Sequence, residues 1–347
     1  MPLKANSGQH GQTRPPDDLV GLLRKSARIL VVGHQNPDGD AVGSALALAH
    51  ALISLGKTAT VGLTGSTAAS LDFLLKGKTF VERVAFSPSL KDDHDLLVLV
   101  DCQAPYRVWP EAENKLLARL PPFVVVDHHH PGPQAARHHL AAYVNSRASA
   151  TAELVFKIVK ALGAEFSKEI VDALLAGLIS DTGSFSQGNA TSECLRQASE
   201  LVALGGDIER VNHFLKRNWP AARMRLLAAS LGTLTQHLGG RLAAMLVTQD
   251  ILNKTGAALS ETEGLVEYPL MMTGVEVAAL LRVNGQLQTK VSLRSRSEVD
   301  VRKLAQSMGG GGHKQAAAYV DDDPDPAVAL ARLVPLVAKI LPAESDD

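Results

Sequence analysis

The sequence has few aromatic residues and no excess of charge of either sign. Phe, Tyr and Trp make up 4% of the 347 residues, whereas hydrophobic residues as a group make up 46%. The apolar content is therefore mainly Leu, Val and Ala, which is typical of sheets covered by helices and disfavours a binding module built on aromatic platforms. Because 35 Lys and Arg are balanced by 36 Asp and Glu, we expect no global positive field that would hold a long duplex nucleic acid.

Cysteines and long apolar runs are also scarce. Cys102 and Cys194 are too few for a disulfide framework or a thiolate zinc site, and we interpret them as buried free thiols in a reducing compartment. No run of about 18 apolar residues is present, and the N-terminal residues lack the apolar core of a signal peptide. We therefore expect a cytoplasmic protein that does not associate with a membrane.

The length and the local composition predict two domains. A chain of 347 residues suits two domains of about 100–200 residues each. Residues 1–16 are polar and rich in Gly and Pro, and we predict a disordered tail there. We predict a catalytic domain over residues 17–218, a connector over 219–240 and a smaller second domain over 241–343.

Short apolar segments alternate with helical patterns in the predicted first domain. Continuous apolar runs of this length are typical of strands that are buried on both faces of a parallel sheet. Alternation with helices predicts an α/β fold with a doubly wound, mainly parallel sheet. The predicted strands cover residues 28–33, 58–63, 96–100 and 123–126, and the predicted helices cover 41–55, 149–162, 168–179, 192–204 and 208–215.

The predicted second domain is also α/β. We expect strands over residues 241–247, 275–283 and 288–294. The last two strands are predicted to form a hairpin around Asn284 and Gly285, because Asn-Gly is a strong signal for a type I′ turn.

Acidic and histidine residues follow the predicted strands of the first domain. Because ligands of doubly wound sheets bind beyond the carboxyl ends of the strands, we expect these side chains to converge. Crowded carboxylates repel one another, and divalent cations would neutralise them. Mixed carboxylate and imidazole ligands suit Mn²⁺, with Co²⁺, Zn²⁺ and Fe²⁺ feasible and Mg²⁺ less suited. The residues are His34, Asp38 and Asp40 after the first strand, Asp101 after the third, Asp127, His128 and His129 at the fourth, and Asp181 at the end of a helix.

Four segments resemble, in order and spacing, the motifs of the DHH phosphoesterases. They are HQNPDGDAVGS at residues 34–44, Asp101 after a strand, DHH at 127–129 and SDTG at 180–183. The resemblance implies two Mn²⁺ ions that share one aspartate. It places His129 beside the substrate phosphate and gives Asp127 the role of orienting a ligand histidine or the local backbone. The ligands it implies are His34, Asp38 and Asp101 for one ion, and Asp40, Asp101, His128 and Asp181 for the other.

The C-terminal part resembles the DHHA1 domain of the same family. GGGGHKQAAA at residues 309–318 is similar to the DHHA1 signature, with Ala318 in place of its last glycine, and SLRSR at 292–296 resembles the segment that supplies a substrate arginine. Closely approaching backbone N–H groups would bind phosphate oxygens, and an arginine would clamp them through two nitrogen atoms. The substrate-binding residues implied are Arg294, Gly310, Gly311, Gly312 and His313.

The size and the domain pair resemble the nanoRNase and pAp-phosphatase branch of this family. That branch implies a phosphoric ester hydrolase acting on short RNA or on 3′-phosphoadenosine 5′-phosphate (pAp), with a second domain that closes over the substrate. An inorganic pyrophosphatase or exopolyphosphatase and a metal-free nucleotide-binding regulator remain alternatives. The DHHA1 signature disfavours the first alternative, and the intact ligand positions disfavour the second. The sequence leaves a homodimer open.

Several of these residues also have purely structural interpretations. Asp38 suits the N-cap of a helix, and a glycine run such as 309–312 is often a flexible linker. Glu263 and Glu267 lie one turn apart on a predicted helix, where we expect them to form an exposed face. Arg296 alternates with Arg294 along a predicted strand, and we interpret it as a solvated charge.

Overall fold

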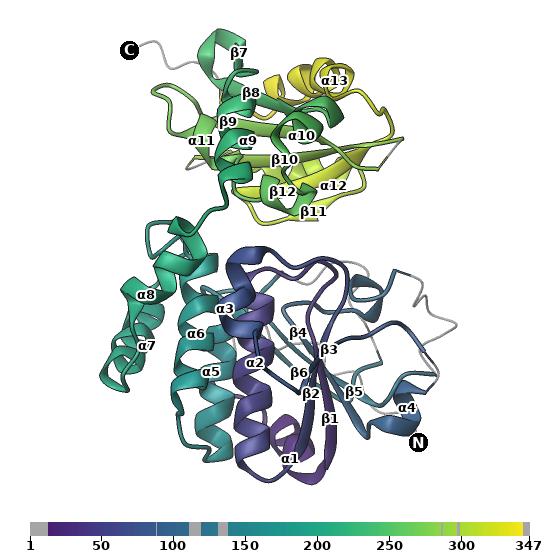
Figure 1. Cartoon of the computed structure of the whole chain (residues 1–347), viewed down its shortest axis with the longest axis vertical. Helices are drawn as coiled ribbons and strands as arrows, with labels where there is room; N and C mark the ends of the chain where they lie inside the picture. Colours follow the sequence, from purple (N-terminus) through teal and green to yellow (C-terminus); the bar gives the residue numbers. More distant parts are fainter. Residues whose placement is uncertain are drawn as a thin grey trace. The chain divides into compact units, whose positions relative to one another are not determined.

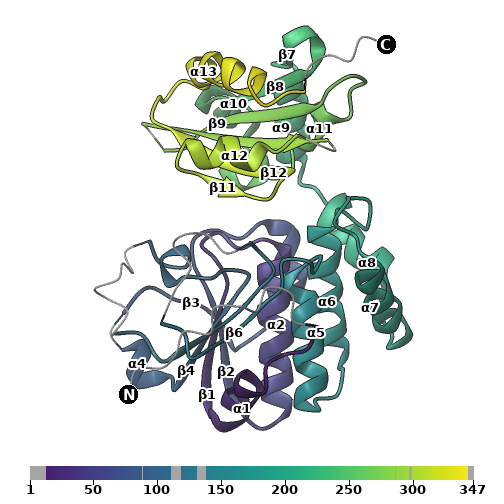
Figure 2. The same ribbon diagram turned by 180° about the vertical axis from the view of Figure 1, so that it is seen from behind.

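The computed structural model describes residues 13–87, 89–110, 119–130, 138–285, 287–296 and 299–342. The chain forms two compact units that divide between Asn218 and Trp219, and Figures 1 and 2 show each of them from two sides. The predicted disordered tail over 1–16 lies outside the described residues as far as residue 12. Over the described ranges, no helix combines the length and the apolar character needed to cross a membrane.

A parallel sheet forms the centre of the first unit. Its six described strands follow the order β3-β2-β1-β4-β5-β6, and every neighbouring pair is parallel. This arrangement confirms the predicted doubly wound fold. The chain moves outward from β1 in one direction and from β4 in the other, so the gap between β1 and β4 is the topological switch point where such sheets bind ligands. The strands are β1 (Arg28–Val32), β2 (Thr58–Leu63), β3 (Val81–Arg83), β4 (Leu96–Val100), β5 (Phe123–Asp127) and β6 (Ala141–Val144).

The helices of the first unit are mostly where the sequence predicts them. Figures 1 and 2 show α2, α5 and α6 side by side against one face of the sheet. The helix predicted over 208–215 is a short α-helix followed by a π-helical turn, His213–Arg217. The helices are α1 (Asp17–Lys25), α2 (Gly39–Ser54), α3 (Asp72–Leu75), α4 (Leu90–Asp93), α5 (Thr151–Leu162), α6 (Lys168–Asp181), α7 (Ser192–Ala203) and α8 (Ile208–Asn212), with 3₁₀ turns η1 (Ala69–Leu71) and η2 (Pro105–Arg107).

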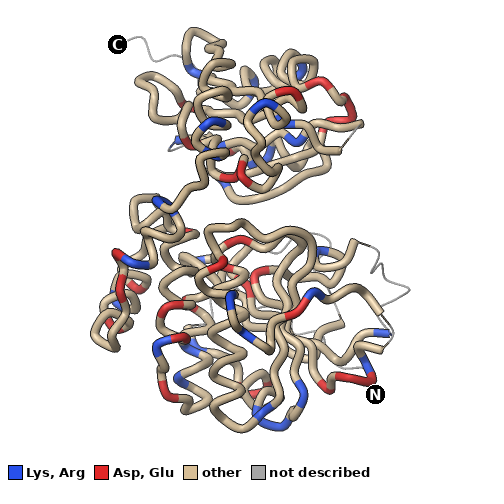
Figure 3. Tube along the Cα trace, in the orientation of Figure 1, with Lys and Arg blue, Asp and Glu red and all other residues tan. Residues whose placement is uncertain are grey.

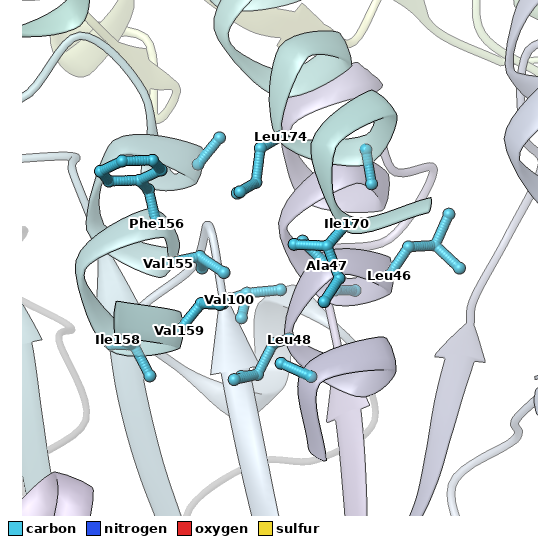
Figure 4. Close-up of a cluster of buried hydrophobic side chains, with 14 of the residues drawn as sticks. Leu46, Ala47, Leu48, Val100, Val155, Phe156, Ile158, Val159, Ile170 and Leu174 are labelled. Carbon is cyan, nitrogen blue, oxygen red and sulfur yellow. The ribbon is translucent and has the colours of Figure 1, made fainter. Parts of the chain in front are cut away.

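Alternate residues of each strand enter different cores. Ile29 and Val31 of β1 join the cluster under α2, α5 and α6, whereas Leu30 and Val32 join a second cluster on the opposite face. Figure 4 shows side chains of these three helices gathered around Val100 of β4. Both faces of the sheet are therefore buried, as its continuous apolar strands require.

The helices α2 and α6 approach each other most closely at a crossing near Gly43 and Gly177. A Cβ atom added at Gly43 would lie 2.3 Å from the carbonyl oxygen of Ala173 and 3.0 Å from the nitrogen of Gly177. At Gly177 an added Cβ would lie 2.6 Å from Cβ of Ala152 on α5 and 2.8 Å from a carboxylate oxygen of Asp40. Small residues at this crossing allow the start of α2 to lie against both α5 and α6.

The second unit is a smaller α/β sandwich, as predicted. Its six described strands follow the order β11-β12-β10-β9-β8-β7, with β8 and β9 parallel and the other pairs antiparallel. Helices α9, α10 and α11 pack on one face and α12 and α13 on the other. The elements are α9 (Ala221–Leu231), β7 (Thr235–His237), β8 (Leu242–Val247), α10 (Gln249–Thr255), α11 (Glu267–Leu270), β9 (Val277–Val283), β10 (Thr289–Ser295), α12 (Val301–Ser307), β11 (Gly311–Gly312), β12 (Ala316–Asp321) and α13 (Pro326–Ala338).

Two local predictions for this unit differ from the structure. Residues 219–240, predicted as a connector, contain α9 and β7, and Leu226 of α9 is fully buried in the core of the second unit. The β9–β10 connection is longer than a two-residue turn, because Val283 pairs with Thr289. A type I′ turn needs positive φ at both central residues, and of Asn284 and Gly285 only Gly285 has it, at 72°.

The α2–α6 crossing yields a stability prediction. Gly43→Ala is expected to destabilise the first unit by about 1–3 kcal/mol, because the added methyl group would meet the backbone of α6. The matched control is Gly21→Ala in α1, where an added Cβ meets nothing within 4 Å. That control is expected to stabilise the protein by roughly 0.5–1 kcal/mol through the loss of glycine's unfolded-state freedom. Calorimetric unfolding of both variants tests the crossing, and an unchanged transition in Gly43→Ala would contradict it.

Candidate metal centre

One group of predicted ligands assembles between the ends of β1 and β4. His34 and Asp38 lie in the loop after β1, and Asp101 directly follows β4. Nε2 of His34 lies 3.6 Å from Oδ2 of Asp101 and 3.9 Å from Oδ1 of Asp38. Ligand atoms from the three residues all lie within 4.8 Å of one another, which is close enough to hold one metal ion.

A second group assembles around His128, which follows β5. Its Nε2 atom lies 3.6 Å from Oδ1 of Asp101 and 3.9 Å from Oδ2 of Asp40. Asp181, the last residue of α6, places Oδ2 at 3.1 Å from the same nitrogen. Asp101 therefore presents Oδ2 to His34 and Oδ1 to His128, which is the arrangement of a carboxylate shared by two metal ions.

Both histidines present Nε2 to the carboxylates in the way that metal-binding imidazoles do. Nδ1 of His34 lies 3.0 Å from the carbonyl oxygen of Gln35, and Nδ1 of His128 lies 3.2 Å from that of Ala148. A carbonyl oxygen only accepts hydrogen bonds, so Nδ1 carries the proton in each ring. Burial, together with the charge of His129, lowers the pKa of His128 to about 4, which keeps this ring neutral. The donor set thus fits a divalent cation.

Asp101 adopts an uncommon backbone conformation. Its φ angle is 58°, in the left-handed region that few residues other than glycine occupy, although Asp tolerates this region better than most. The residue is 2% exposed, and its N–H donates to the carbonyl oxygen of Val126 on β5 at 3.0 Å. Such strain persists only where the surrounding structure holds it, and it is common at functional sites.

Burial and mutual repulsion disfavour ionisation of the two innermost carboxyl groups. Burial, followed by the charge of Asp38, raises the pKa of Asp40 to about 7. Burial and the neighbouring carboxylates, Asp40 and Asp38 foremost, raise the pKa of Asp101 well above its usual range. A bound divalent cation would reverse both effects, because it favours the ionised form of every carboxylate that it contacts.

Asp127 contacts both the ring and the backbone of His129. Oδ1 of Asp127 lies 2.8 Å from Nδ1 of His129 and accepts the backbone N–H of the same residue at 3.2 Å. Burial disfavours the charge on His129, but the carboxylate of Asp127, together with those of Asp181 and Asp38, outweighs burial and raises the pKa of His129 to about 9. Asp127 therefore orients His129 and favours its positive charge at neutral pH.

The start of α5 holds the carboxylates in place, which the sequence did not predict. The backbone N–H groups of Thr151 and Ala152 donate to Asp40 at 2.6 and 2.9 Å, where the positive end of the helix dipole favours a negative charge. Oγ1 of Thr151 donates to Oδ1 of Asp101 at 2.9 Å, and the hydroxyl of Ser44 donates to Asp40 at 3.2 Å. Thr151 and Asp40 are 111 residues apart in the sequence, and no motif links them.

Asp38 has both of the roles that its sequence context indicates. Its Oδ1 atom caps α2 by accepting the N–H groups of Asp40 and Ala41, each at 3.1 Å. The same carboxylate belongs to the His34 group. The structural interpretation of this residue and the functional one are therefore compatible.

In the second unit, Arg294 forms an ion pair with Glu267. Nε of Arg294 donates to Oε1 of Glu267 at 2.7 Å, and Nη1 donates to the carbonyl oxygen of Leu293 at 3.1 Å. The expectation that Glu263 and Glu267 form one exposed helical face is therefore wrong, since α11 begins only at Glu267 and this side chain turns to Arg294 on β10. Arg296 donates instead to the carbonyl oxygen of Leu270 at 2.6 Å.

The glycine run is part of the sheet and not a linker. Gly311 and Gly312 form β11 and pair with Ala318 and Ala317 of β12. A Cβ atom at Gly310 would lie 2.1 Å from the carbonyl oxygen of Ala318, so only glycine fits there. His313 lies in the turn that follows, where its N–H donates to the carbonyl oxygen of Ala316 at 2.7 Å.

Comparisons with known proteins match both units. The profile of the DHH family, N-terminal domain, matches residues 28–178, and that of the DHHA1 domain matches residues 239–333. The chain is 33% identical over 304 residues to the bifunctional oligoribonuclease and PAP phosphatase NrnA of Thermus thermophilus, and the match covers 86% of each protein. It is 27% identical over 338 residues to the cyclic-di-AMP phosphodiesterase GdpP of Bacillus subtilis, and it spans about half of that longer protein, 48%.

Solved structures support the fold. An exopolyphosphatase-related protein from Bacteroides fragilis superposes with a TM-score of 0.82 at 24% identity, covering 93% of this chain and 95% of that one. RecJ from Thermus thermophilus in complex with Mn²⁺ gives a TM-score of 0.55 at 17% identity, covering 93% of this chain and 54% of that one.

The contact between Thr151 and Asp101 yields a test of the centre. Thr151→Val keeps the shape of the side chain but removes the hydroxyl that orients Asp101, and we expect Mn²⁺ affinity to fall by about 10–100-fold. Thr151→Ser retains the hydroxyl and is expected to bind Mn²⁺ nearly as well as the unsubstituted protein. Calorimetric titration with Mn²⁺ measures both, with thermal unfolding as a check on folding. Equal affinities in the two variants would show that the hydroxyl does not support the metal centre.

Proposed function

Since the chain belongs to the DHH family and also carries a DHHA1 domain, we propose that it is a metal-dependent phosphoesterase that hydrolyses very short RNA and pAp. The observation that carries this proposal is the position of Asp101, whose two carboxylate oxygens face two different histidines. In this proposal, residues 17–218 form the catalytic domain, residues 241–343 bind the substrate, and the protein is cytoplasmic.

Two divalent ions, Mn²⁺ by preference, fit the two groups of side chains. His34, Asp38 and Asp101 would hold one ion. Asp40, Asp101, His128 and Asp181 would hold the other. When bound, the ions would supply Lewis acidity that makes water a better nucleophile and would neutralise charge on the phosphate.

His129 is proposed to contact the substrate phosphate. Asp127 fixes the orientation of its ring through Nδ1, and the resulting charge on the imidazole favours an anionic partner. Asp127 itself acts through His129 and does not need to touch the substrate. This arrangement assigns the two residues different tasks, binding for His129 and positioning for Asp127.

Residues of the second unit are proposed to hold the rest of the substrate. Glu267 fixes Arg294 through Nε, which leaves the guanidinium oriented for a phosphate. Gly310, Gly311, Gly312 and His313 lie at the hairpin formed by β11 and β12, where glycines permit a close backbone approach. The ion pair with Glu267 also keeps Arg294 in one conformation, which lowers the entropic cost of binding.

The preference for short substrates rests on the charge distribution and on the relatives. Among the described residues, Lys and Arg are scattered between Asp and Glu over both units (Figure 3). Such a surface provides little of the phosphate neutralisation that long nucleic acids require. The similarity to cyclic-di-AMP phosphodiesterase GdpP favours a second candidate, a cyclic dinucleotide or its linear product.

Metal removal and a substrate panel test this function. We expect two Mn²⁺ per chain, with hydrolysis of pApA and pAp lost on chelation and restored by Mn²⁺. The panel adds cyclic-di-AMP, a long single-stranded RNA and inorganic pyrophosphate, with pApA and pAp expected to give the highest kcat/KM. Asp101→Asn serves as the inactive control, because the shared carboxylate contacts both groups.

Each outcome of the chelation and substrate experiments bears on a different part of the proposed function. Hydrolysis of pApA that survives complete chelation would contradict the metal-dependent mechanism. Faster hydrolysis of pyrophosphate than of pAp would indicate that inorganic phosphates, and not nucleotides, are the preferred substrates. Faster hydrolysis of cyclic-di-AMP would favour the second candidate.

Substitution of Arg294 tests the role of the second unit. Arg294→Ala removes a charge-assisted phosphate contact worth about 1.5–3 kcal/mol, so kcat/KM should fall by roughly ten- to a hundredfold. Glu267→Gln should give a smaller loss, mainly in KM, because Arg294 remains but is less well oriented. Arg296→Ala is the matched control, since this neighbour donates to a backbone carbonyl group. Equal kinetics in Arg294→Ala and Arg296→Ala would exclude Arg294 as the clamp, and metal content should stay unchanged throughout.

A further inference from the structure

The first unit contains a cavity beside the metal centre that the proposed mechanism does not use. It lies at the ends of β1, β2 and β3 and has a volume of about 320 Å³. This volume is at the lower end of the range for small-molecule sites, which is about 300–1,000 Å³. It is therefore suited to a single small group. The residues that characterise its wall are the apolar Val84, Val108 and Trp109 and the polar Gln35, Thr64 and Arg83.

Thr64 points to a ligand. The residue is 7% exposed, and its Oγ1 atom has no hydrogen-bond partner among the described residues. A buried hydroxyl in this state is destabilising, and a valine of the same shape would avoid the cost. Thr64 lines the cavity, so a rotation of its side chain would bring the hydroxyl to a polar group bound there.

The loop after β1 connects this cavity to the metal centre. His34 faces Asp101, whereas the next residue, Gln35, lines the cavity. Two backbone hydrogen bonds hold the loop. The N–H of Gln35 donates to the carbonyl oxygen of Arg107 at 2.7 Å, and the N–H of Asn36 donates to the backbone carbonyl oxygen of Thr64 at 3.0 Å. The consecutive residues His34 and Gln35 therefore belong to the metal centre and to the cavity wall, respectively.

We propose that this cavity binds one nucleobase of the substrate, next to the phosphate that is held at the metal centre. The proposal deepens the function proposed above and rests on it for the identity of the substrate. Apolar walls fit the faces of a heterocycle, and the hydroxyl of Thr64 and the amide of Gln35 both donate and accept hydrogen bonds at its edge.

A phosphate group fits the cavity less well than a base. Arg83 is the only cation among the described residues that line the cavity. Its guanidinium already donates to the carbonyl oxygen of Gly65 and, at 3.4 Å, to the hydroxyl of Thr67. The remaining lining residues are uncharged. A neutral base therefore matches this surface better than a dianion does.

The fluorescence of Trp109 reports directly whether the cavity is occupied. The measurement requires neither bound metal nor catalysis. The chain has two tryptophans, so Trp219→Phe leaves Trp109 in the cavity wall as the single reporter. Titration of this full-length variant with adenosine should change Trp109 emission in a saturable manner. Ribose 5-phosphate and inorganic phosphate should not.

Two substitutions test whether the signal comes from the cavity. In the Trp219→Phe background, Ala85→Leu fills the space at a lining residue, and it should abolish the response to adenosine. Ala203→Leu, at an exposed position on α7, is the control and should leave the response unchanged. Thr64→Val should weaken adenosine binding by about tenfold without lowering the unfolding temperature, whereas a purely structural hydroxyl would show the reverse.

Kinetics then relate the cavity to the reaction. Ala85→Leu should raise KM for pApA by about tenfold while leaving hydrolysis of a dinucleotide with one abasic residue unchanged. No Trp109 response to adenosine in the Trp219→Phe protein, or a response that Ala85→Leu leaves unaltered, would overturn the cavity assignment. A response to ribose 5-phosphate equal to that for adenosine would show that the cavity does not recognise the base. If adenosine binds as expected but no phosphoester is hydrolysed, the proposed function fails while the nucleobase site stands.

Discussion

Repulsion between buried carboxylates is the constraint on which the first unit depends. Asp40 and Asp101 are almost completely excluded from solvent and lie close to further aspartates, so that their pKa values rise. Such a cluster is costly in a folded protein unless positive charge or hydrogen-bond donors compensate it. The fold supplies donors from the start of α5, and two histidines present Nε2 to the same carboxylates.

The packing of the helices serves this compensation. Gly43 and Gly177 let α2, α5 and α6 approach until Asp40 reaches the N–H groups of Thr151 and Ala152. A bulkier residue at either glycine would push the helices apart and withdraw the donors from the carboxylate. The apolar core of this unit and its polar site are thus parts of one packing arrangement, since the same helix contacts stabilise the fold and position the ligands.

The two units carry different kinds of polar groups. Oxygen and imidazole ligands gather in the first unit, at the switch point of a parallel sheet. The second unit carries an oriented arginine and a glycine hairpin, which suit anion binding. Among its described residues, no group of three or more His, Cys, Asp or Glu side chains is placed to hold a metal ion by itself. This separation explains why the proposed metal-binding and substrate-holding roles are open to independent substitution.

The sequence by itself determined the parallel strands β1, β2, β4 and β5, the long helices α2, α5, α6 and α7, and the convergence of His34, Asp101 and His128. The outer strands β3 and β6 and the helix α1 were not predicted. Apolar runs define strands locally, and the carboxyl ends of parallel strands must meet at one edge of the sheet. Only the tertiary structure decided that Thr151 supports Asp101, that Glu267 orients Arg294 and that residues 219–240 enter the second core. These contacts join residues far apart in the chain, and they depend on how closely helices and strands pack, which no local pattern of residues encodes.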